Sequence, residues 1–129
     1  MVRKLRQKAK DDSTDTRLKS GLKGAAVYRQ MDRLQSDLNL KFKDKNLLVR
    51  ALTHRSFVNE YGSETRDNER LEYLGDSVLG LVVNEYLFKH FGEYTEGSLA
   101  KIKSAVVSEA TLSKVARDLE LGRYIFMGR

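Results

Sequence analysis

The stretch that most constrains the fold of this chain is residues 68–84, where apolar residues recur at helical spacing. The apolar residues of this pattern are Leu71, Leu74, Val78, Leu79, Leu81 and Val82, and Tyr86 just beyond the stretch continues it. At about 100° per residue they fall in one broad arc of a helical wheel. The pattern therefore predicts one long helix whose apolar side is largely buried against other elements.

The same stretch carries three carboxylates on one side. Glu69, Glu72 and Asp76 are three and four residues apart, so on a helix they project together at the edge of the apolar arc. Glu72 and Asp76 form a like-charge pair that costs a few tenths of a kcal/mol, and no Lys or Arg follows any of the three acids at helical spacing. From the spacing alone, a metal site and an unusual solvated acidic face remain alternatives.

Residues 68–79 also carry a resemblance to a known family. They read N-E-R-L-E-Y-L-G-D-S-V-L, which resembles the signature helix of the ribonuclease III family, N-E-R-L-E-F-L-G-D-S-V-L, with Tyr73 in place of Phe. Residues 42–44, 51–57 and 107–112 resemble further family segments, so the resemblance covers roughly residues 27–129. It implies an all-α, ribonuclease III-type endonuclease domain that is incomplete at its C-terminus.

The resemblance also assigns roles to single residues. Glu72 and Asp76 match two of the four metal ligands of the family and are the expected catalytic residues. Glu69 and Glu96 match acidic residues of the family that orient the RNA and the two subunits. Tyr73 matches an aromatic residue that inserts into the partner of a homodimer, and the alternative is a tyrosine ring packed on its own domain. The other two metal ligands of the family have no counterpart in this sequence.

The function implied by the resemblance is cleavage of double-stranded RNA, in rRNA or mRNA processing. The hydrolysis depends on Mg²⁺, with Mn²⁺ as a substitute, and leaves 5′ phosphates. With two of four metal ligands, this chain alone is expected to be inactive or nearly so, and the apolar surface of its signature helix is expected to lie uncovered. The alternative function is a catalytically incomplete, RNA-binding or ribosome-associated structural module.

Composition limits the other possibilities. The chain has 129 residues, 40% of them hydrophobic, which is enough for one domain. Because it has no Cys and two His, any metal site must be rich in oxygen ligands, which suits Mg²⁺ or Mn²⁺. No apolar run is long enough for a signal peptide or a membrane span, so a cytoplasmic location is expected.

The charge is unevenly distributed. Residues 1–24 hold eight Lys or Arg and three Asp, a net charge of +5, whereas the whole chain has +6. We interpret residues 1–24 as a basic, disordered arm and residues 25–129 as the domain. The arm is either a solubilising leader or a segment that contacts RNA.

The remaining pattern predicts five or six helices and no strand. One helix covers residues 25–38 and a second starts after Asp44 as its N-cap and ends at His54 and Arg55, where His54 has a structural role. Residues 59–67 form a loop. Thr95 and Ser108 are the predicted N-caps of two later helices, the second of which stops at Gly122. Residues 124–128 are interpreted as an interrupted connection.

Overall fold

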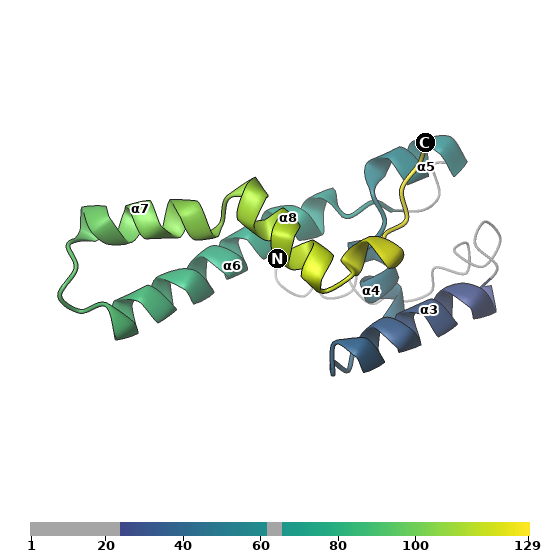
Figure 1. The fold of residues 1–129 in the computed structure, drawn as a ribbon. Coiled ribbons are helices and arrows are strands. Elements are labelled where there is room, and N and C mark those ends of the chain that lie inside the picture. The colour runs from purple at the N-terminus through teal and green to yellow at the C-terminus, as the bar shows by residue number, and fades with distance from the viewer. Residues whose placement is uncertain (1–23, 62–65) are drawn as a thin grey trace, which may run out of the picture. The chain divides into compact units, whose positions relative to one another are not determined.

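The computed structural model describes residues 24–61 and 66–129, and its regular elements there are helices. They are α3 (Gly24–Asp37), α4 (Lys45–Ala51), α5 (Arg55–Tyr61), α6 (Glu69–His90), α7 (Glu96–Val106), α8 (Glu109–Asp118) and the 3₁₀ helix η2 (Leu121–Arg123) (Figure 1). The all-α prediction is confirmed. The predicted basic arm lies outside the described residues, apart from Gly24. In the part of the chain that the structure describes, no helix is long and apolar enough to cross a membrane.

The chain divides into two compact units with different cores. Unit 1 comprises residues up to Asn68 together with Tyr124–Arg129, and unit 2 is Glu69–Arg123. The buried core of unit 1 comes from α3, α4 and the two segments that follow α4 and η2. Its members are Val27, Met31, Leu34, Leu48, Val49, Thr53, Tyr124 and Phe126.

The turn between α3 and α4 follows from local sequence. After α3 the chain adopts a left-handed conformation at Asn39 (φ 50°), and Leu40 N donates to Gln35 O at 2.8 Å, which satisfies a carbonyl at the helix end. Helix α4 starts at the predicted cap, because the Asp44 carboxylate accepts hydrogen bonds from Asn46 N (2.9 Å) and Leu47 N (3.1 Å). The predicted break and N-cap are both confirmed.

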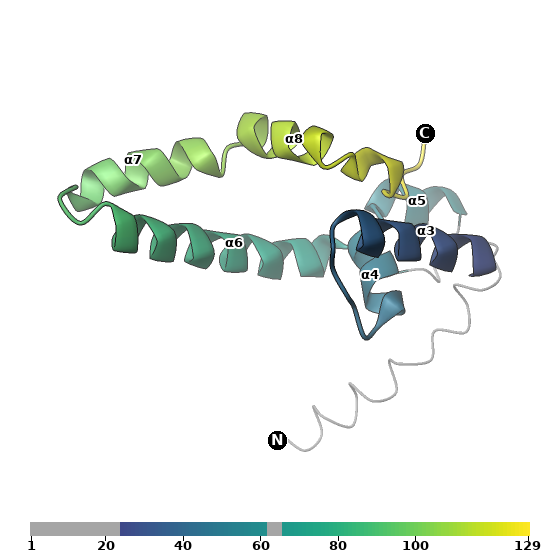
Figure 2. The same ribbon diagram turned by 60° about the horizontal axis from the view of Figure 1, so that its bottom comes forward.

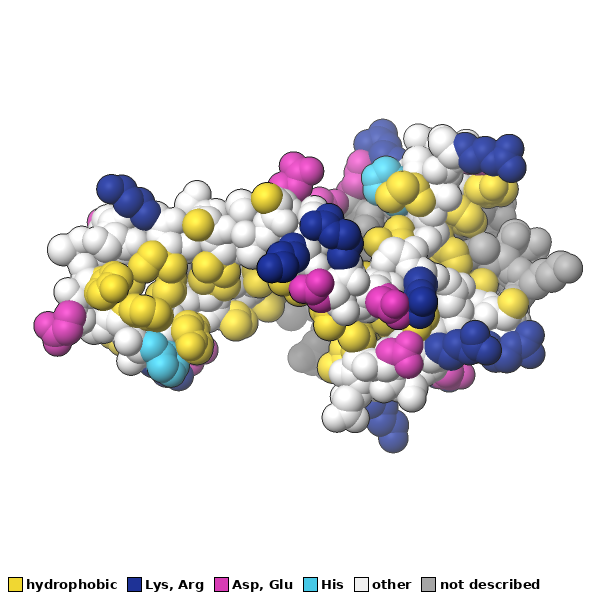
Figure 3. Space-filling model, viewed as in Figure 1, with side chains coloured by type: hydrophobic (Ala, Val, Ile, Leu, Met, Phe, Trp, Pro, Cys, Tyr) yellow, Lys and Arg dark blue, Asp and Glu magenta, His cyan; other side chains and the backbone are white. Residues whose placement is uncertain are grey.

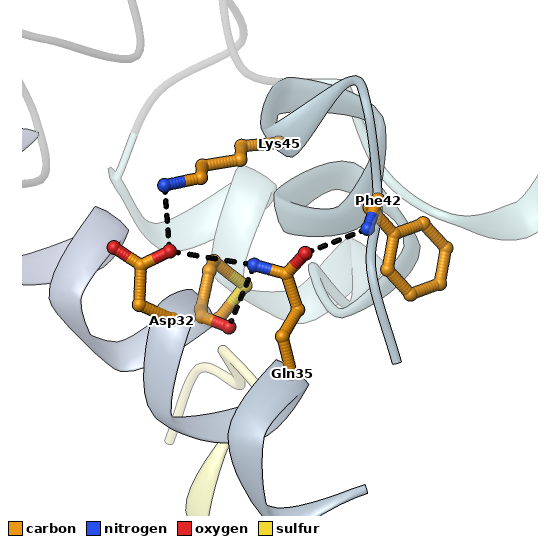
Figure 4. Close-up of polar contacts among 5 residues, drawn as sticks. Asp32, Gln35, Phe42 and Lys45 are labelled. Atoms are coloured by element: carbon orange, nitrogen blue, oxygen red, sulfur yellow. Dashed lines mark hydrogen bonds and ion pairs between the residues drawn. The ribbon is translucent and has the colours of Figure 1, made fainter. Parts of the chain in front are cut away.

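Side chains of α3 hold this turn in place (Figure 4). Gln35 Oε1 accepts a hydrogen bond from Phe42 N at 2.7 Å, and Lys45 Nζ lies 2.6 Å from Asp32 Oδ1. The amide of Gln35 also donates to Met31 O at 3.3 Å. The turn is therefore fixed by backbone and side-chain contacts to the helix that precedes it.

The segment after η2 is built into unit 1. Phe126 N donates to Leu52 O (2.8 Å) and His54 N donates to Phe126 O (2.9 Å), which makes an isolated parallel bridge between Thr53 and Phe126. Phe126 is also buried, as is Tyr124, whose hydroxyl donates to the Asp37 carboxylate. Residues 124–128, interpreted from the sequence as an interrupted connection, thus contribute Tyr124 and Phe126 to the core of unit 1.

A separate short helix occupies the place where one helix was expected to end. Helix α4 stops at Ala51, and α5 begins at Arg55 instead of ending there. His54 Nδ1 accepts a hydrogen bond from Ser56 N at 3.1 Å and lies 2.7 Å from Ser56 Oγ, so it satisfies a donor in the first turn of α5. The predicted loop over residues 59–67 was correspondingly wrong at its start, since α5 continues to Tyr61.

Unit 2 consists of a helical hairpin and α8. Helices α6 and α7 lie side by side in both ribbon views, and α8 follows α7 and contacts it and η2, its neighbours in the chain (Figures 1 and 2). The predicted caps of α7 and α8 are confirmed, because Thr95 Oγ1 accepts from Ser98 N (3.3 Å) and Ser108 Oγ accepts from Thr111 N (3.4 Å). The predicted stop at Gly122 was wrong: α8 ends at Asp118, and the left-handed residue after it is Glu120 (φ 52°).

Helix α6 is much more exposed than its apolar pattern predicted. Among its described side chains only Leu87 is fully buried, at 5% exposure, and hydrophobic side chains gather on the surface of the α6–α7 hairpin (Figure 3). The prediction of a largely buried helix was wrong for this chain, because α7, which packs on α6, covers only part of the arc. The accompanying expectation of uncovered apolar surface is confirmed. The exposed members are Leu74, Val78, Leu81, Val82 and Tyr86.

Candidate metal and RNA site

Glu72 and Asp76 stand on the first half of α6 as an exposed pair. Helical geometry places them one turn apart on the same side, as their spacing predicted. Within the described residues neither carboxylate makes a hydrogen bond or an ion pair. Two like charges that make no direct ion pair repel each other in the free protein, and a cation that binds both removes this repulsion.

The pair lines an open depression of about 640 Å³ on the surface of unit 2. Helix α6 contributes most of this surface, and α8 contributes one apolar residue at its edge. The lining residues are Glu69, Glu72, Tyr73, Gly75, Asp76, Ser77, Leu79 and Leu112. The structure thus brings the three predicted acids of α6 and the predicted interface tyrosine to one surface.

Glu96 lies apart from this depression. It is the first residue of α7, which follows the far end of α6, and it does not line the surface described above. Helix α6 ends at His90, shortly before Glu96. Asp76 precedes His90 by about two-thirds of the length of α6, which corresponds to roughly 20 Å at 1.5 Å per residue. Glu96 therefore belongs to a separate part of unit 2 and is not placed to share a ligand with Glu72.

The donor chemistry of the pair fits Mg²⁺ in part. Carboxylate oxygens are the ligands this hard cation prefers, and its bound waters fill positions that the protein leaves open. However, residues 24–61 and 66–129 contain no group of three or more His, Cys, Asp or Glu side chains arranged to hold a metal ion. Glu72 and Asp76 can thus supply two ligands of a site whose other positions are filled by water or by groups from elsewhere.

A lysine that sequence reasoning missed lies beside Asp76. A second depression, of about 330 Å³, is lined by Asp76, Ser77, Gly80, Leu81, Asn84, Lys103 and Val107. Lys103 comes from α7, so nothing in the local pattern of α6 could identify it. The signal in the sequence was Gly80, a poor helix former that leaves room for another element.

Comparison with known proteins identifies the family. The model of a protein family described as Ribonuclease-III-like matches residues 44–129. Ribonuclease 3 of Campylobacter jejuni subsp. jejuni serotype O:6 is 50% identical over 99 residues, which are 77% of this chain and 42% of that protein. Ribonuclease 3 of Treponema denticola is 49% identical over 112 residues, which are 87% of this chain and 45% of that protein. The chain thus spans less than half of the length of these relatives.

The fold comparison agrees. A structure of the nuclease domain of ribonuclease III from Campylobacter jejuni, described for flexibility in a region involved in dimer formation, matches with a TM-score of 0.68 and 49% identity. The match covers 76% of this chain and 65% of that one. A second structure of the same domain matches with a TM-score of 0.65. The signature helix, the all-helical fold and these matches together show that the chain belongs to the ribonuclease III family.

Proposed function

We propose that this chain carries the signature-helix part of a Mg²⁺-dependent endoribonuclease that cleaves double-stranded RNA. The observation that carries the proposal is the exposed pair Glu72 and Asp76, which lie one turn apart without an internal partner. A structural module has no need for such a pair. The match to bacterial ribonucleases 3 supports cleavage of RNA, and the proposal includes a role in rRNA or mRNA processing in the cytoplasm.

Glu72 and Asp76 would hold the metal ion in this enzyme. When bound, Mg²⁺, or Mn²⁺ in its place, supplies an activated water, neutralises charge on the phosphate and stabilises the leaving oxygen. The protein contributes two fixed carboxylates on a rigid helix. We assign Glu69, on the rim of the same depression, and Glu96, at the start of α7, to positioning the RNA and the subunits.

We further propose that two copies of the chain associate through α6. Tyr73 is 82% exposed, so its ring does not pack on its own unit, and other large apolar side chains of the same helix are exposed as well. A large aromatic ring that is exposed in one copy gains free energy when a second copy buries it. The similar nuclease domain of Campylobacter jejuni has a flexible region that is involved in dimer formation in that protein.

Metal binding is the first test of the proposal. Isothermal titration of the chain with Mn²⁺ or Mg²⁺ should show weak binding, because two ligands make a partial site. Asp76→Asn should abolish this binding, since it removes one of the two charges. Glu93→Gln, an exposed acid in the turn after α6, serves as the matched control and should bind normally. An isotherm that Asp76→Asn leaves unchanged would rule out the metal assignment.

Cleavage is the second test, and it separates the enzyme from the structural module. The described residues offer two metal ligands. Each further ligand that is missing costs several kcal/mol of transition-state stabilisation, so the chain alone should barely cut duplex RNA. A chimera that adds the remaining part of the Campylobacter jejuni nuclease domain should cut with Mg²⁺ and leave 5′ phosphates. Asp76→Asn in the chimera should abolish cutting. A chimera that binds duplex RNA but never cuts it in Mg²⁺ or Mn²⁺ would support the structural module instead.

A further inference from the structure

The side chain of Lys103 reaches from α7 across α6 at Gly80. Its Nζ lies 3.5 Å and its Cε 3.8 Å from the position that a Cβ would take at Gly80. Because residue 80 has no side chain, the ammonium group can lie against the helix surface. Asp76 precedes Gly80 by one helical turn and Asn84 follows it by one turn, so all three lie along one stripe of α6. The ammonium therefore lies between Asp76 and Asn84 in the depression that they line.

Lys103 has no partner for its charge. Across the described ranges its ammonium makes no hydrogen bond and no ion pair. The carboxylate of Asp76 is therefore too far from the ammonium for a direct ion pair. The side chain is nevertheless half-buried. A partly desolvated ammonium group that makes no direct ion pair is unfavourable in the free protein, and an anion that contacts it in the depression relieves this cost.

The other lining groups indicate which anion fits. Asn84 contributes an amide to the same depression and can donate beside the ammonium, whereas the hydroxyl of Ser77 donates to Tyr73 O at 3.4 Å. Asp76 is shared with the larger acidic depression and is the residue that connects the two surfaces. An RNA phosphate has oxygens that can accept from Lys103 while the same backbone passes Asp76.

We propose that Lys103 binds a backbone phosphate of the RNA and thereby positions the strand beside Asp76. This inference deepens the proposed function and rests on it for the identity of the ligand. It assigns to Lys103 a contact with substrate phosphate, not with the metal ion. The competing role is structural, in which only the aliphatic stem matters because it packs on α6 at Gly80.

Binding of a short RNA duplex to the full chain, followed by fluorescence anisotropy over a range of salt concentrations, tests this proposal. Lys103→Met keeps the stem and removes the charge, whereas Lys103→Arg keeps the charge. Lys101→Met is the matched control, because Lys101 is an exposed lysine of the same helix that lines neither depression. We expect Lys103→Met to weaken binding about three- to tenfold and to lower the slope of log K against log salt by about 0.9, the value for one lost phosphate contact.

The variants give distinguishable outcomes. Lys103→Arg should restore most of the affinity, and Lys101→Met should change it by less than Lys103→Met does. Equal effects of the two methionine variants, or no binding of duplex RNA by the unmodified chain, would overturn the role of Lys103. In either case, loss of metal binding in Asp76→Asn would still support the proposed function. Conversely, a selective effect of Lys103→Met with unchanged metal binding in Asp76→Asn would keep the phosphate contact and remove the metal site. Thermal unfolding shows whether each variant is folded.

Discussion

At the scale of single residues, Gly128 shows how little space unit 1 leaves around its last segment. Gly128 N donates to Ser56 Oγ at 3.0 Å, and Arg129 N donates to Glu60 Oε2 at 2.7 Å. A Cβ at residue 128 would lie 2.6 Å from Ser56 O and 2.7 Å from Glu60 Oε2, both shorter than normal contacts. Any side chain there must push the segment away from α5.

Gly128→Ala should therefore destabilise the protein. We expect a loss of about 1–3 kcal/mol in the free energy of unfolding, since overpacking against backbone forces a shift of the chain. Gly75→Ala is the matched control: a Cβ there meets nothing within 4 Å, and alanine in a helix is favoured over glycine by up to about 1 kcal/mol. Urea unfolding followed by circular dichroism measures both. Equal stability of the two variants would show that the segment can move freely.

Residues whose role depends on local geometry could be predicted from the sequence. Asp44, Thr95 and Ser108 cap their helices because a cap needs only the next three residues. Glu72 and Asp76 share a side of α6 because the helical repeat fixes their directions. Lys103 could not be found in this way, since its place beside Gly80 depends on how α7 packs on α6.

At the scale of elements, α6 is the helix on which the proposed functions depend. One side contacts α7, its first half presents the acids, and much of its apolar arc is exposed. Exposed large side chains along one helix favour association, because burying them removes apolar surface from water. The proposed dimer contact through Tyr73 makes use of this surface.

Replacing Tyr73 should weaken self-association. The helix offers a matched control in Phe88, because the two rings are similarly exposed, at 82% for Tyr73 and 78% for Phe88, and lie near opposite ends of α6. We expect Tyr73→Ala to raise the dimer dissociation constant at least tenfold, as loss of a buried aromatic contact costs about 1.4 kcal/mol or more. Phe88→Ala should have a smaller effect. Sedimentation velocity at several concentrations measures both, and identical association of the two variants would remove Tyr73 from the interface.

The type of most elements could be predicted, but their surroundings could not. The apolar arc of residues 68–84 correctly indicated a helix, because periodicity reports on the segment itself. Its burial was wrong, because burial depends on which other elements cover the arc. Helix α5 was missed because its first turn depends on the His54 side chain, which is not among the common helix caps.

At the scale of the whole molecule, the two units differ in how they are stabilised. Unit 1 contains nearly all of the fully buried side chains, including Met31, Val49 and Thr53, whereas the described side chains of unit 2 include one fully buried apolar residue, Leu87. Burial of apolar surface is the main favourable contribution to folding. Less apolar burial therefore stabilises unit 2 than unit 1.

Hydrogen exchange should reveal this difference. We expect the backbone amides of α3 and α4 to exchange more slowly than those of α7 and α8, because opening the latter exposes few buried groups. Hydrogen–deuterium exchange with mass spectrometry on the unmodified chain measures the protection of each helix. Equal protection throughout would mean that both units open together in one cooperative step.

The basic arm should dominate nonspecific binding to RNA. Residues 1–24 hold eight Lys or Arg and three Asp, so they carry +5 of the net charge of +6. Deleting them should flatten the dependence of duplex binding on salt, because fewer counterions are released from the RNA. Anisotropy titrations with and without the arm measure the slope. An unchanged slope would make the arm a solubilising leader, which was the alternative from the sequence.

The parallel bridge between Thr53 and Phe126 has a consequence for the order in which the protein forms during synthesis. Unit 1 cannot be finished until Phe126 has left the ribosome, whereas all of the α6–α7 hairpin has emerged before then. The hairpin is therefore synthesised while the core of unit 1 still lacks Tyr124 and Phe126. Nascent chains are most exposed to premature aggregation during this interval, and slower translation of the segment that carries Tyr124 and Phe126 should prolong it.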